Sequence, residues 1–240
     1  MRIVKAIFVS LFVLMPFTHS SSARTLEISD VVPKELILSP KVVSDSIICT
    51  GSFGGPNGYG YTWIDSDTAG GPTYNWIEIS TIGTRIQDEQ WRSPGPNPLD
   101  DGTAGPFPIG FSFPYNHSVF DSVYIGTNGI ISFSDTNLTS EGYFYLNAHI
   151  PQMIFSNPLV VFWNDLSLDP NAGHGGGDVY YWTNSSDTFI VEYKNVKPYS
   201  DSLTSDTVTF QIILNKRDSS ITFQYQSVVT PNSWYYGNPA

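Results

Sequence analysis

Ile109-Gly-Phe-Ser-Phe113 alternates large apolar side chains with small residues, as a β-strand with one buried face does. Similar strand-like segments follow at Ser122-Val-Tyr-Ile-Gly126 and Ile130-Ile-Ser-Phe133, which the short break Thr127-Asn-Gly129 separates. Two apolar segments on either side of an Asn-Gly turn are the sequence signature of a β-hairpin. We therefore expect the central part of the chain to be antiparallel β-structure.

Further strand-like segments extend on both sides of this hairpin, and helical periodicity is nearly absent. Turn-forming residues separate them, as in the polar segment Lys216–Ser220. Leu159–Trp163 is a continuous apolar run, which predicts a strand buried on both faces. Many short strands with turn signals between them indicate an all-β fold, an antiparallel β-sandwich or jelly-roll-like single domain. The further strands are expected at Tyr74–Ile79, Asp178–Trp182, Thr188–Tyr193, Val208–Leu214 and Ile221–Tyr225.

In their order along the chain, these segments resemble the extracellular β-sandwich domain of nidogen, in the form found in secreted bacterial multidomain proteins. The resemblance includes Pro158-Leu-Val-Val-Phe-Trp-Asn-Asp-Leu166, since the family often has two acidic residues after the tryptophan. Upstream, Tyr61–Trp76 is similar to the bacterial versions. The resemblance implies a nidogen-like domain over residues 59–240, used for adhesion in animals and without agreed catalytic residues. Because the family usually continues for another strand, we expect this domain to be truncated at its C-terminus.

The N-terminus has the pattern of a cleavable signal peptide, residues 1–23. Arg2 and Lys5 precede an apolar run over residues 6–17, which is too short to span a bilayer. Small residues before Arg24 fit cleavage after Ala23. The chain is therefore expected to be secreted or held at the cell surface, with no membrane insertion after cleavage.

Residues 24–58 show little periodicity, and we expect a linker with at most a short strand there. Cys49 is the only cysteine, so the fold must be held by its core, or by metal, without an internal disulfide. We expect Cys49 to behave as a buried small hydrophobe.

The chain is acidic, with a net charge of −11. Loss of Arg2 and Lys5 with the signal peptide would leave 9 Lys and Arg against 22 Asp and Glu, a net charge of −13. Proteins that bind nucleic acids or anionic membrane surfaces use basic patches, so neither is expected as a partner of this acidic chain. The same charge is compatible with divalent cations, which prefer oxygen ligands.

Two groups of carboxylate and amide side chains are candidates for structural calcium sites. Asp65-Ser-Asp-Thr-Ala-Gly70 begins like a helix-loop-helix calcium loop, but Ala69 at its fifth position and Trp76 at its twelfth exclude that motif. Irregular sites are the remaining possibility, and the alternative is that these side chains cap turns. The candidate groups are Asp65, Asp67, Asp100 and Asp101, and Asn164, Asp165, Asp169 and Asp178.

Aromatic residues offer a second kind of candidate, because exposed tryptophan and tyrosine rings can stack on sugar rings. The alternative is that they pack in the core or on strand edges. The glycan-stacking candidates lie in or near loops and strand ends: Trp91, Trp182, Trp234, Tyr235 and Tyr236.

No catalytic motif is recognisable in the sequence. The nucleophile motif G-x-S-x-G and the zinc motif H-E-x-x-H are absent, and His117, His149 and His174 lack metal-ligand spacing. We therefore predict that the chain is not an enzyme and carries no certain cofactor, with calcium as the one candidate.

The predicted function is a non-catalytic extracellular adhesion or accessory module of a larger secreted or cell-surface protein. Its partner would be an extracellular protein or a glycan. Two alternatives stay open: the non-catalytic N-terminal part of a secreted hydrolase, such as a peptidase, whose catalytic domain lies beyond residue 240, and a carbohydrate-binding module.

Overall fold

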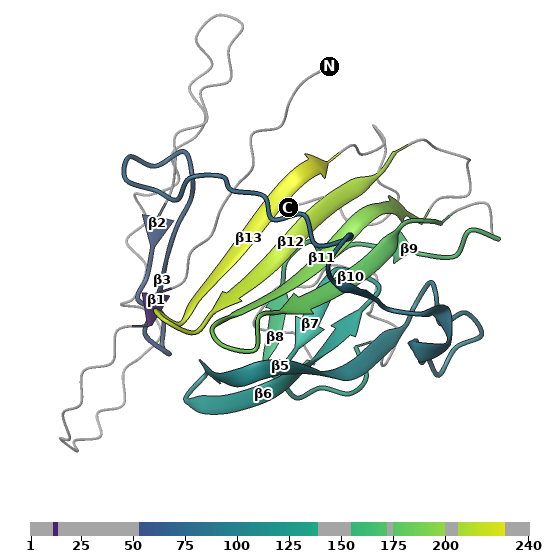
Figure 1. The fold of residues 1–240 in the computed structure, drawn as a ribbon, viewed down its shortest axis with the longest axis horizontal. Helices are drawn as coiled ribbons and strands as arrows, with labels where there is room; N and C mark the ends of the chain where they lie inside the picture. The colour runs from purple at the N-terminus through teal and green to yellow at the C-terminus, as the bar shows by residue number, and fades with distance from the viewer. Residues whose placement is uncertain (1–11, 14–52, 139–154, 172–174, 200–205, 229–240) are drawn as a thin grey trace, which may run out of the picture.

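A computed structural model describes residues 12–13, 53–138, 155–171, 175–199 and 206–228. These residues form strands, turns and one short 3-10 helix, η2 (Asp88–Gln90), and no α-helix occurs among them. The strands build antiparallel sheets, which confirms the all-β sandwich (Figure 1). The predicted signal peptide except Phe12–Val13, most of the predicted linker with Cys49, and the chain end after Val228 lie outside the described residues.

The larger sheet contains five strands from the C-terminal half of the chain and one short strand from upstream. Antiparallel pairing gives the order β13-β12-β11-β10-β4, and β9 pairs with the end of β11. We call it the six-stranded sheet; its strands are β4 (Thr84–Arg85), β9 (Leu166–Ser167), β10 (Asp178–Thr183), β11 (Thr188–Pro198), β12 (Val208–Asn215) and β13 (Ser220–Val228).

The second layer is a four-stranded sheet in the order β5-β6-β7-β8, a simple antiparallel meander. Its strands are β5 (Thr103–Tyr115), β6 (Ser118–Gly126), β7 (Ile130–Ser132) and β8 (Pro158–Val160). The predicted turn at Thr127–Gly129 joins β6 to β7, as the sequence indicated. Gly129 has a φ of 74°, and a Cβ there would lie 2.1 Å from the carbonyl oxygen of Phe162, so only glycine fits.

A small third sheet joins β1 (Phe12–Val13), β3 (Tyr61–Ile64) and β2 (Phe53–Gly54) in the order β1-β3-β2. The side chain of Tyr61 attaches this sheet to the sandwich, since its hydroxyl accepts a hydrogen bond from the backbone N–H of Asn116 at 2.8 Å.

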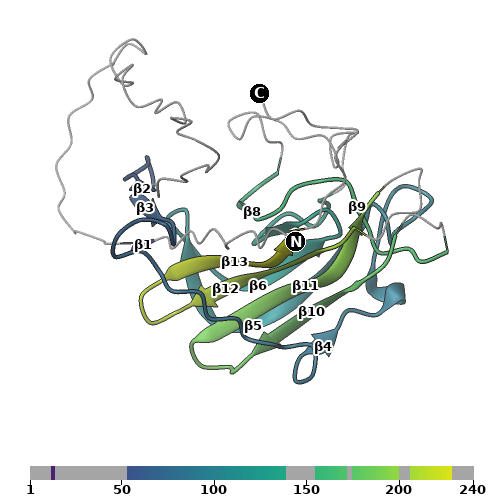
Figure 2. The same cartoon turned by 90° about the horizontal axis from the view of Figure 1, so that it is seen from above.

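The core lies between the two larger sheets, whose layers Figure 2 shows, and it contains many aromatic side chains. Tyr193 is fully buried and stacks on Phe210 of the neighbouring strand, with ring centroids 4.5 Å apart. Across the two sheets, Phe107 of β5 packs on Tyr181 of β10 at 4.6 Å. The Tyr193 hydroxyl donates to the carbonyl of Gly126 at 2.6 Å, so a buried polar atom also links the sheets.

The outer edge of the four-stranded sheet is formed by β5, which shows the predicted alternation. Phe107, Ile109, Phe111 and Phe113 are buried, and the residues between them are exposed. Three prolines lie in this strand, at positions 106, 108 and 114. Proline has no N–H, which suits a strand whose outer side makes few ladder hydrogen bonds.

Two of the predicted strands are wrong in part or in whole. Of the apolar run Leu159–Trp163, only its first two residues belong to β8; Trp163 turns away and packs in a second small cluster with Ile130 and Phe155. Tyr74–Ile79 is not a strand at all. It crosses the outer face of the six-stranded sheet and is held there by side chains.

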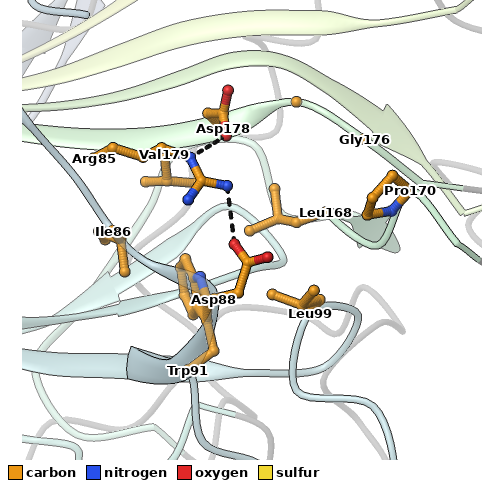
Figure 3. Close-up of a pocket in the computed structure, with 11 residues that line it drawn as sticks. Arg85, Ile86, Asp88, Trp91, Leu99, Leu168, Pro170, Gly176, Asp178 and Val179 are labelled. Atoms are coloured by element: carbon orange, nitrogen blue, oxygen red, sulfur yellow. Dashed lines mark hydrogen bonds and ion pairs between the residues drawn. The ribbon is translucent and has the colours of Figure 1, made fainter.

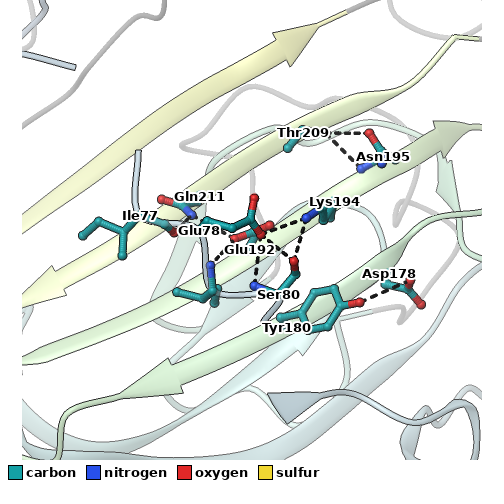
Figure 4. Close-up of polar contacts among 11 residues, drawn as sticks. Ile77, Glu78, Ser80, Asp178, Tyr180, Glu192, Lys194, Asn195, Thr209 and Gln211 are labelled. Atoms are coloured by element: carbon teal, nitrogen blue, oxygen red, sulfur yellow. Dashed lines mark hydrogen bonds and ion pairs between the residues drawn. The ribbon is translucent and has the colours of Figure 1, made fainter. Parts of the chain in front are cut away.

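We call residues 74–80 the strap, and a row of polar side chains holds it (Figure 4). Glu192, Gln211 and Gln224 lie in register on β11, β12 and β13. The Gln224 amide exchanges two hydrogen bonds with the backbone of Asn75, at 3.2 and 3.0 Å. The Gln211 amide donates to the carbonyl of Ile77, and Glu192 Oε2 accepts the N–H of Ile79 at 3.1 Å. These three side chains therefore bind the strap with four hydrogen bonds, in the place where a neighbouring strand would form backbone hydrogen bonds.

Glu192 is the charged member of this row and has no exposed surface. Besides the N–H of Ile79, its Oε2 accepts a hydrogen bond from Gln211 Nε2 at 3.0 Å, but Oε1 has no hydrogen-bond partner among the described residues. Burial therefore raises the pKa of Glu192, although the hydrogen bond from Ile79 opposes the shift. Two residues further along β11, Lys194 Nζ lies 2.8 Å from Oε1 of Glu78 in the strap. This ion pair lowers the pKa of Glu78 to about 2.

We expect Glu192→Gln to flatten the pH dependence of stability. Because the folded-state pKa of Glu192 is raised, the contribution of Glu192 to wild-type stability is fully present below about pH 4.5 and is lost as pH rises through the folded pKa. Glutamine keeps an acceptor for Ile79 and does not titrate. Urea unfolding from pH 4 to 8 measures this, and equal slopes for both proteins would contradict it. As a reference, Glu192→Ala should cost about 1–3 kcal/mol at pH 4, because the N–H of Ile79 loses its acceptor, and the cost should shrink as pH rises, because alanine does not titrate.

Candidate functional site

A cavity of about 230 Å³ opens beside the β4–β10 edge of the six-stranded sheet (Figure 3). We call it the β4–β10 cavity. Its walls are apolar, and its rim carries the charged side chains Arg85, Asp88 and Asp178. An apolar hollow with a few converging polar groups is the usual form of a ligand site. The apolar walls are Ile86, Trp91, Leu99, Leu168 and Val179.

Backbone pairing fixes the position of each wall. Arg85 faces Tyr180 in the β4–β10 ladder, and the N–H of Ile86 donates to the carbonyl of Val179 at 2.9 Å. On the opposite side, the N–H of Leu168 donates to the carbonyl of Leu99 at 2.7 Å and joins two loops. The cavity is therefore bounded by hydrogen-bonded segments.

Arg85 is held between two carboxylates at the rim. Its Nε lies 2.5 Å from Asp178 Oδ1, and its Nη2 lies 2.9 Å from Asp88 Oδ1. The hydrogen bond to Asp178 is the main reason that the pKa of Arg85 is raised. The three side chains fix one another in place and together carry a net charge of −1.

Two of the residues singled out from the sequence line this cavity, but in different roles. Asp178 was predicted as a calcium ligand, and here it binds Arg85. Trp91 was predicted to stack on sugars, but only 2% of it is exposed, so its burial in the core removes it from the stacking candidates. Trp182 is partly buried on β10, and Trp234, Tyr235 and Tyr236 lie outside the described residues.

The first predicted calcium group does not assemble as a group. Asp65 is 9% exposed and closes a local turn, where its Oδ1 accepts hydrogen bonds from the N–H groups of Asp67 and Thr68 at 3.1 and 2.9 Å. This is the turn-capping role that was the alternative to metal binding. In the second group, Asp169 accepts a hydrogen bond from the Asn97 amide at 3.0 Å.

The structure instead brings together members of the two groups: Asp100 and Asp101 from the first, and Asp165 from the second. Asn128 of the β6–β7 turn connects them, because its amide donates to Asp101 Oδ1 at 3.0 Å and its oxygen accepts the N–H of Leu166 at 2.8 Å. Burial, with a contribution from Asp100, raises the pKa of Asp101 to about 6. Burial and the two neighbouring carboxylates raise that of Asp165 to about 7.

Within the described ranges, no three His, Cys, Asp or Glu side chains are arranged so that they could hold a metal ion. Asp100, Asp101 and Asp165 are close enough to repel one another, but they are not in a ligating arrangement. Calcium binding therefore stays a prediction.

Sequence reasoning missed most of the cavity. Arg85 lies two residues after Gly83, in a segment that carries no binding motif. Asp88 belongs to a single 3-10 turn, which also has no sequence motif. Leu99 and Leu168 are 69 positions apart in the sequence and meet only because their loops pair. The Asn-Gly turn at residues 128–129 was recognised as a turn, but not as the connection between acidic loops.

The fold and the sequence together define a nidogen-related domain. A family model described as NIDO related matches residues 69–235, most of the chain, and the chain belongs to that family. No curated protein and no solved structure matches this chain. Nidogen-related domains are typically extracellular. No helix among the described residues is long and apolar enough to cross a membrane.

We expect Asp165→Asn to stabilise the protein at pH 8 and to have little effect at pH 4. The carboxylate pKa is raised from 3.8 to about 7, so wild-type stability falls as pH rises through that interval, and asparagine avoids the loss. Thermal unfolding should show this as a higher melting temperature at pH 8, by about 2–4 °C for each kcal/mol regained. Asp121→Asn, an exposed carboxylate on β6, is the matched control; an equal gain in the control would contradict the repulsion between Asp165 and its neighbours.

Calcium binding to Asp100, Asp101 and Asp165 is tested by adding the ion to protein stripped with chelator. A ligand that binds only the folded state raises stability by about 2.7 kcal/mol at 100 times its dissociation constant. If the ion draws these three carboxylates into a ligating arrangement, millimolar Ca²⁺ should raise the melting temperature at pH 8 in wild type and not in Asp165→Asn. A melting temperature that does not respond to Ca²⁺ or to chelator would rule out this site.

Proposed function

We propose that this chain is a non-catalytic extracellular binding module that acts as an adhesion or accessory domain of a larger secreted or cell-surface protein. The observation that carries the proposal is the β4–β10 cavity, a hollow with apolar walls and a rim of three side chains already fixed by ion pairs. When the side chains of a site are already ordered, binding carries no further entropic cost of ordering them.

The chemistry of the cavity supports binding over catalysis. Its described lining residues include no serine, threonine, cysteine, histidine or lysine that could act as a nucleophile or proton-transfer base. Asp88 and Asp178 accept hydrogen bonds from the same guanidinium, an arrangement that fixes their position. Family membership supports the same conclusion, since nidogen-related domains are generally non-catalytic.

The sequence supports an extracellular setting through the signal-peptide pattern of residues 1–23. The acidic balance of the chain, −11 overall, also argues against nucleic acid as the partner. An extracellular protein is the partner we favour. In the alternative arrangement, this domain lies beside the catalytic domain of a secreted hydrolase. The cavity would bind a partner in the same way there.

The carbohydrate-binding alternative rests on fewer residues than the sequence suggested. With Trp91 buried, Trp182 is the one stacking candidate among the described residues that keeps partial exposure. Loss of glycan capture in Trp182→Ala, with no change in Asp88→Asn, would favour that alternative.

The proposed function is tested with the purified, secreted full-length chain. We expect no turnover on panels of peptidase, esterase and glycosidase substrates, and saturable binding to members of peptide and glycan arrays. Binding should weaken at least fivefold when Asp88 and Asp178 are both changed to asparagine. It should be unchanged in the control Glu89→Gln/Asp121→Asn, which removes the same charge from exposed positions outside the cavity. Turnover that co-purifies with the chain and is lost in the cavity variant would overturn the proposal.

A further inference from the structure

We propose that the β4–β10 cavity receives a lysine side chain of a partner polypeptide. The aliphatic stem would lie between the apolar walls, and the ammonium group would lie at the carboxylates of Asp88 and Asp178. This inference rests on the proposed function, because it names the chemistry of the partner that the same cavity binds.

The size of the cavity favours a single side chain over a larger ligand. Its volume of about 230 Å³ lies below the range of about 300–1,000 Å³ that is usual for the pockets of small-molecule ligands. Trp91, the one aromatic residue among the described lining residues, is 2% exposed and presents no open ring face on which a sugar could stack. The remaining walls are aliphatic, from Ile86, Leu99, Leu168 and Val179, and suit an aliphatic stem.

The charge at the rim selects a cation. Asp88 and Asp178 each use one oxygen, Oδ1, to bind Arg85, and their side chains are 58% and 37% exposed. The second oxygen of Asp88 lies on the side of Leu99 and Leu168 (Figure 3). The second oxygen of Asp178 has one long contact, with the hydroxyl of Tyr180 at 3.5 Å. An anionic ligand would meet two carboxylates for one guanidinium, and the acidity of the whole chain adds to that repulsion.

Lysine fits these two conditions better than arginine does. An ammonium group is a compact point charge on a flexible four-carbon stem, whereas a guanidinium is a broad planar fork. A guanidinium, that of Arg85, already bridges the two carboxylates. Lysine side chains commonly bury their stems along apolar surface and keep the charged end near water, which is the geometry that this cavity offers.

The test uses three short peptides that differ at one central residue: lysine, norleucine, and diaminopropionic acid. Norleucine keeps the stem without the charge, and diaminopropionic acid, at a pH below the pKa of its side-chain amine, keeps a cation without the stem. Binding to the full-length protein is followed by NMR, through the methyl signals of Leu99, Leu168 and Val179. We expect the lysine peptide to shift these signals with a dissociation constant near 1 mM, weakening as salt is added. Each of the other peptides should bind at least tenfold more weakly.

Matched variants connect the binding to the rim. Asp88→Asn should weaken lysine binding about three- to tenfold, and its neighbour Glu89→Gln, which loses the same charge outside the cavity, should leave it unchanged. Dispersed core methyl signals verify that each variant is folded, and the peptide comparison in wild type needs no variant at all.

Each outcome decides the inference separately from the proposed function. Equal binding of norleucine and lysine would overturn lysine recognition and leave a binding cavity. Absence of any shift with the lysine peptide would also overturn it, and the proposed function would still stand if another array member shifted the same methyl signals. Enzymatic turnover at the cavity would overturn the proposed function itself.

Discussion

The packing of aromatic rings between the two sheets is the interaction on which the rest of the structure depends. Tyr193 and Phe210 stack at the centre of the six-stranded sheet, and Phe107 meets Tyr181 from the opposite layer. Tyrosine hydroxyls add direction to this apolar contact, since Tyr193 and Tyr225 donate to carbonyls of Gly126 and Val161 at 2.6 Å. Hydrophobic burial alone would allow one sheet to slide over the other, and these fixed hydrogen bonds set a single register. The chain reaches this arrangement without an internal disulfide.

The two faces of the six-stranded sheet are covered in different ways. Its inner face packs against apolar side chains, whereas its outer face carries Glu192, Gln211 and Gln224 beneath the strap. The same strap leads into β4, which places Arg85 beside β10 and so forms one wall of the cavity. The polar row therefore positions the candidate site indirectly, through the segment that it holds against the sheet.

Sequence patterns identified strands where one face of a segment is buried and the partner strand is close along the chain. Ile109–Phe113 and the hairpin around Asn128 are of this kind, and they were predicted from alternation and turn chemistry. The same alternation in Tyr74–Ile79 misled the prediction, because its partners are side chains more than a hundred residues away. The acidic residues were predicted to form two separate groups, but the structure joins Asp100 of one group and Asp165 of the other through the loops that the Asn128 turn connects. Contacts between distant loops leave no local pattern, so the cavity could not be predicted.

The edge strand β5 has a consequence for how this domain behaves among copies of itself. A long exposed edge is a template for pairing with another strand, and it is a common route to aggregation at high concentration. Pro106, Pro108 and Pro114 remove three N–H donors from that edge, so a second chain cannot extend the sheet there with a continuous ladder. Association through this edge would therefore rely more on side chains than on a backbone ladder, which lowers the tendency of neighbouring copies to pair edge to edge.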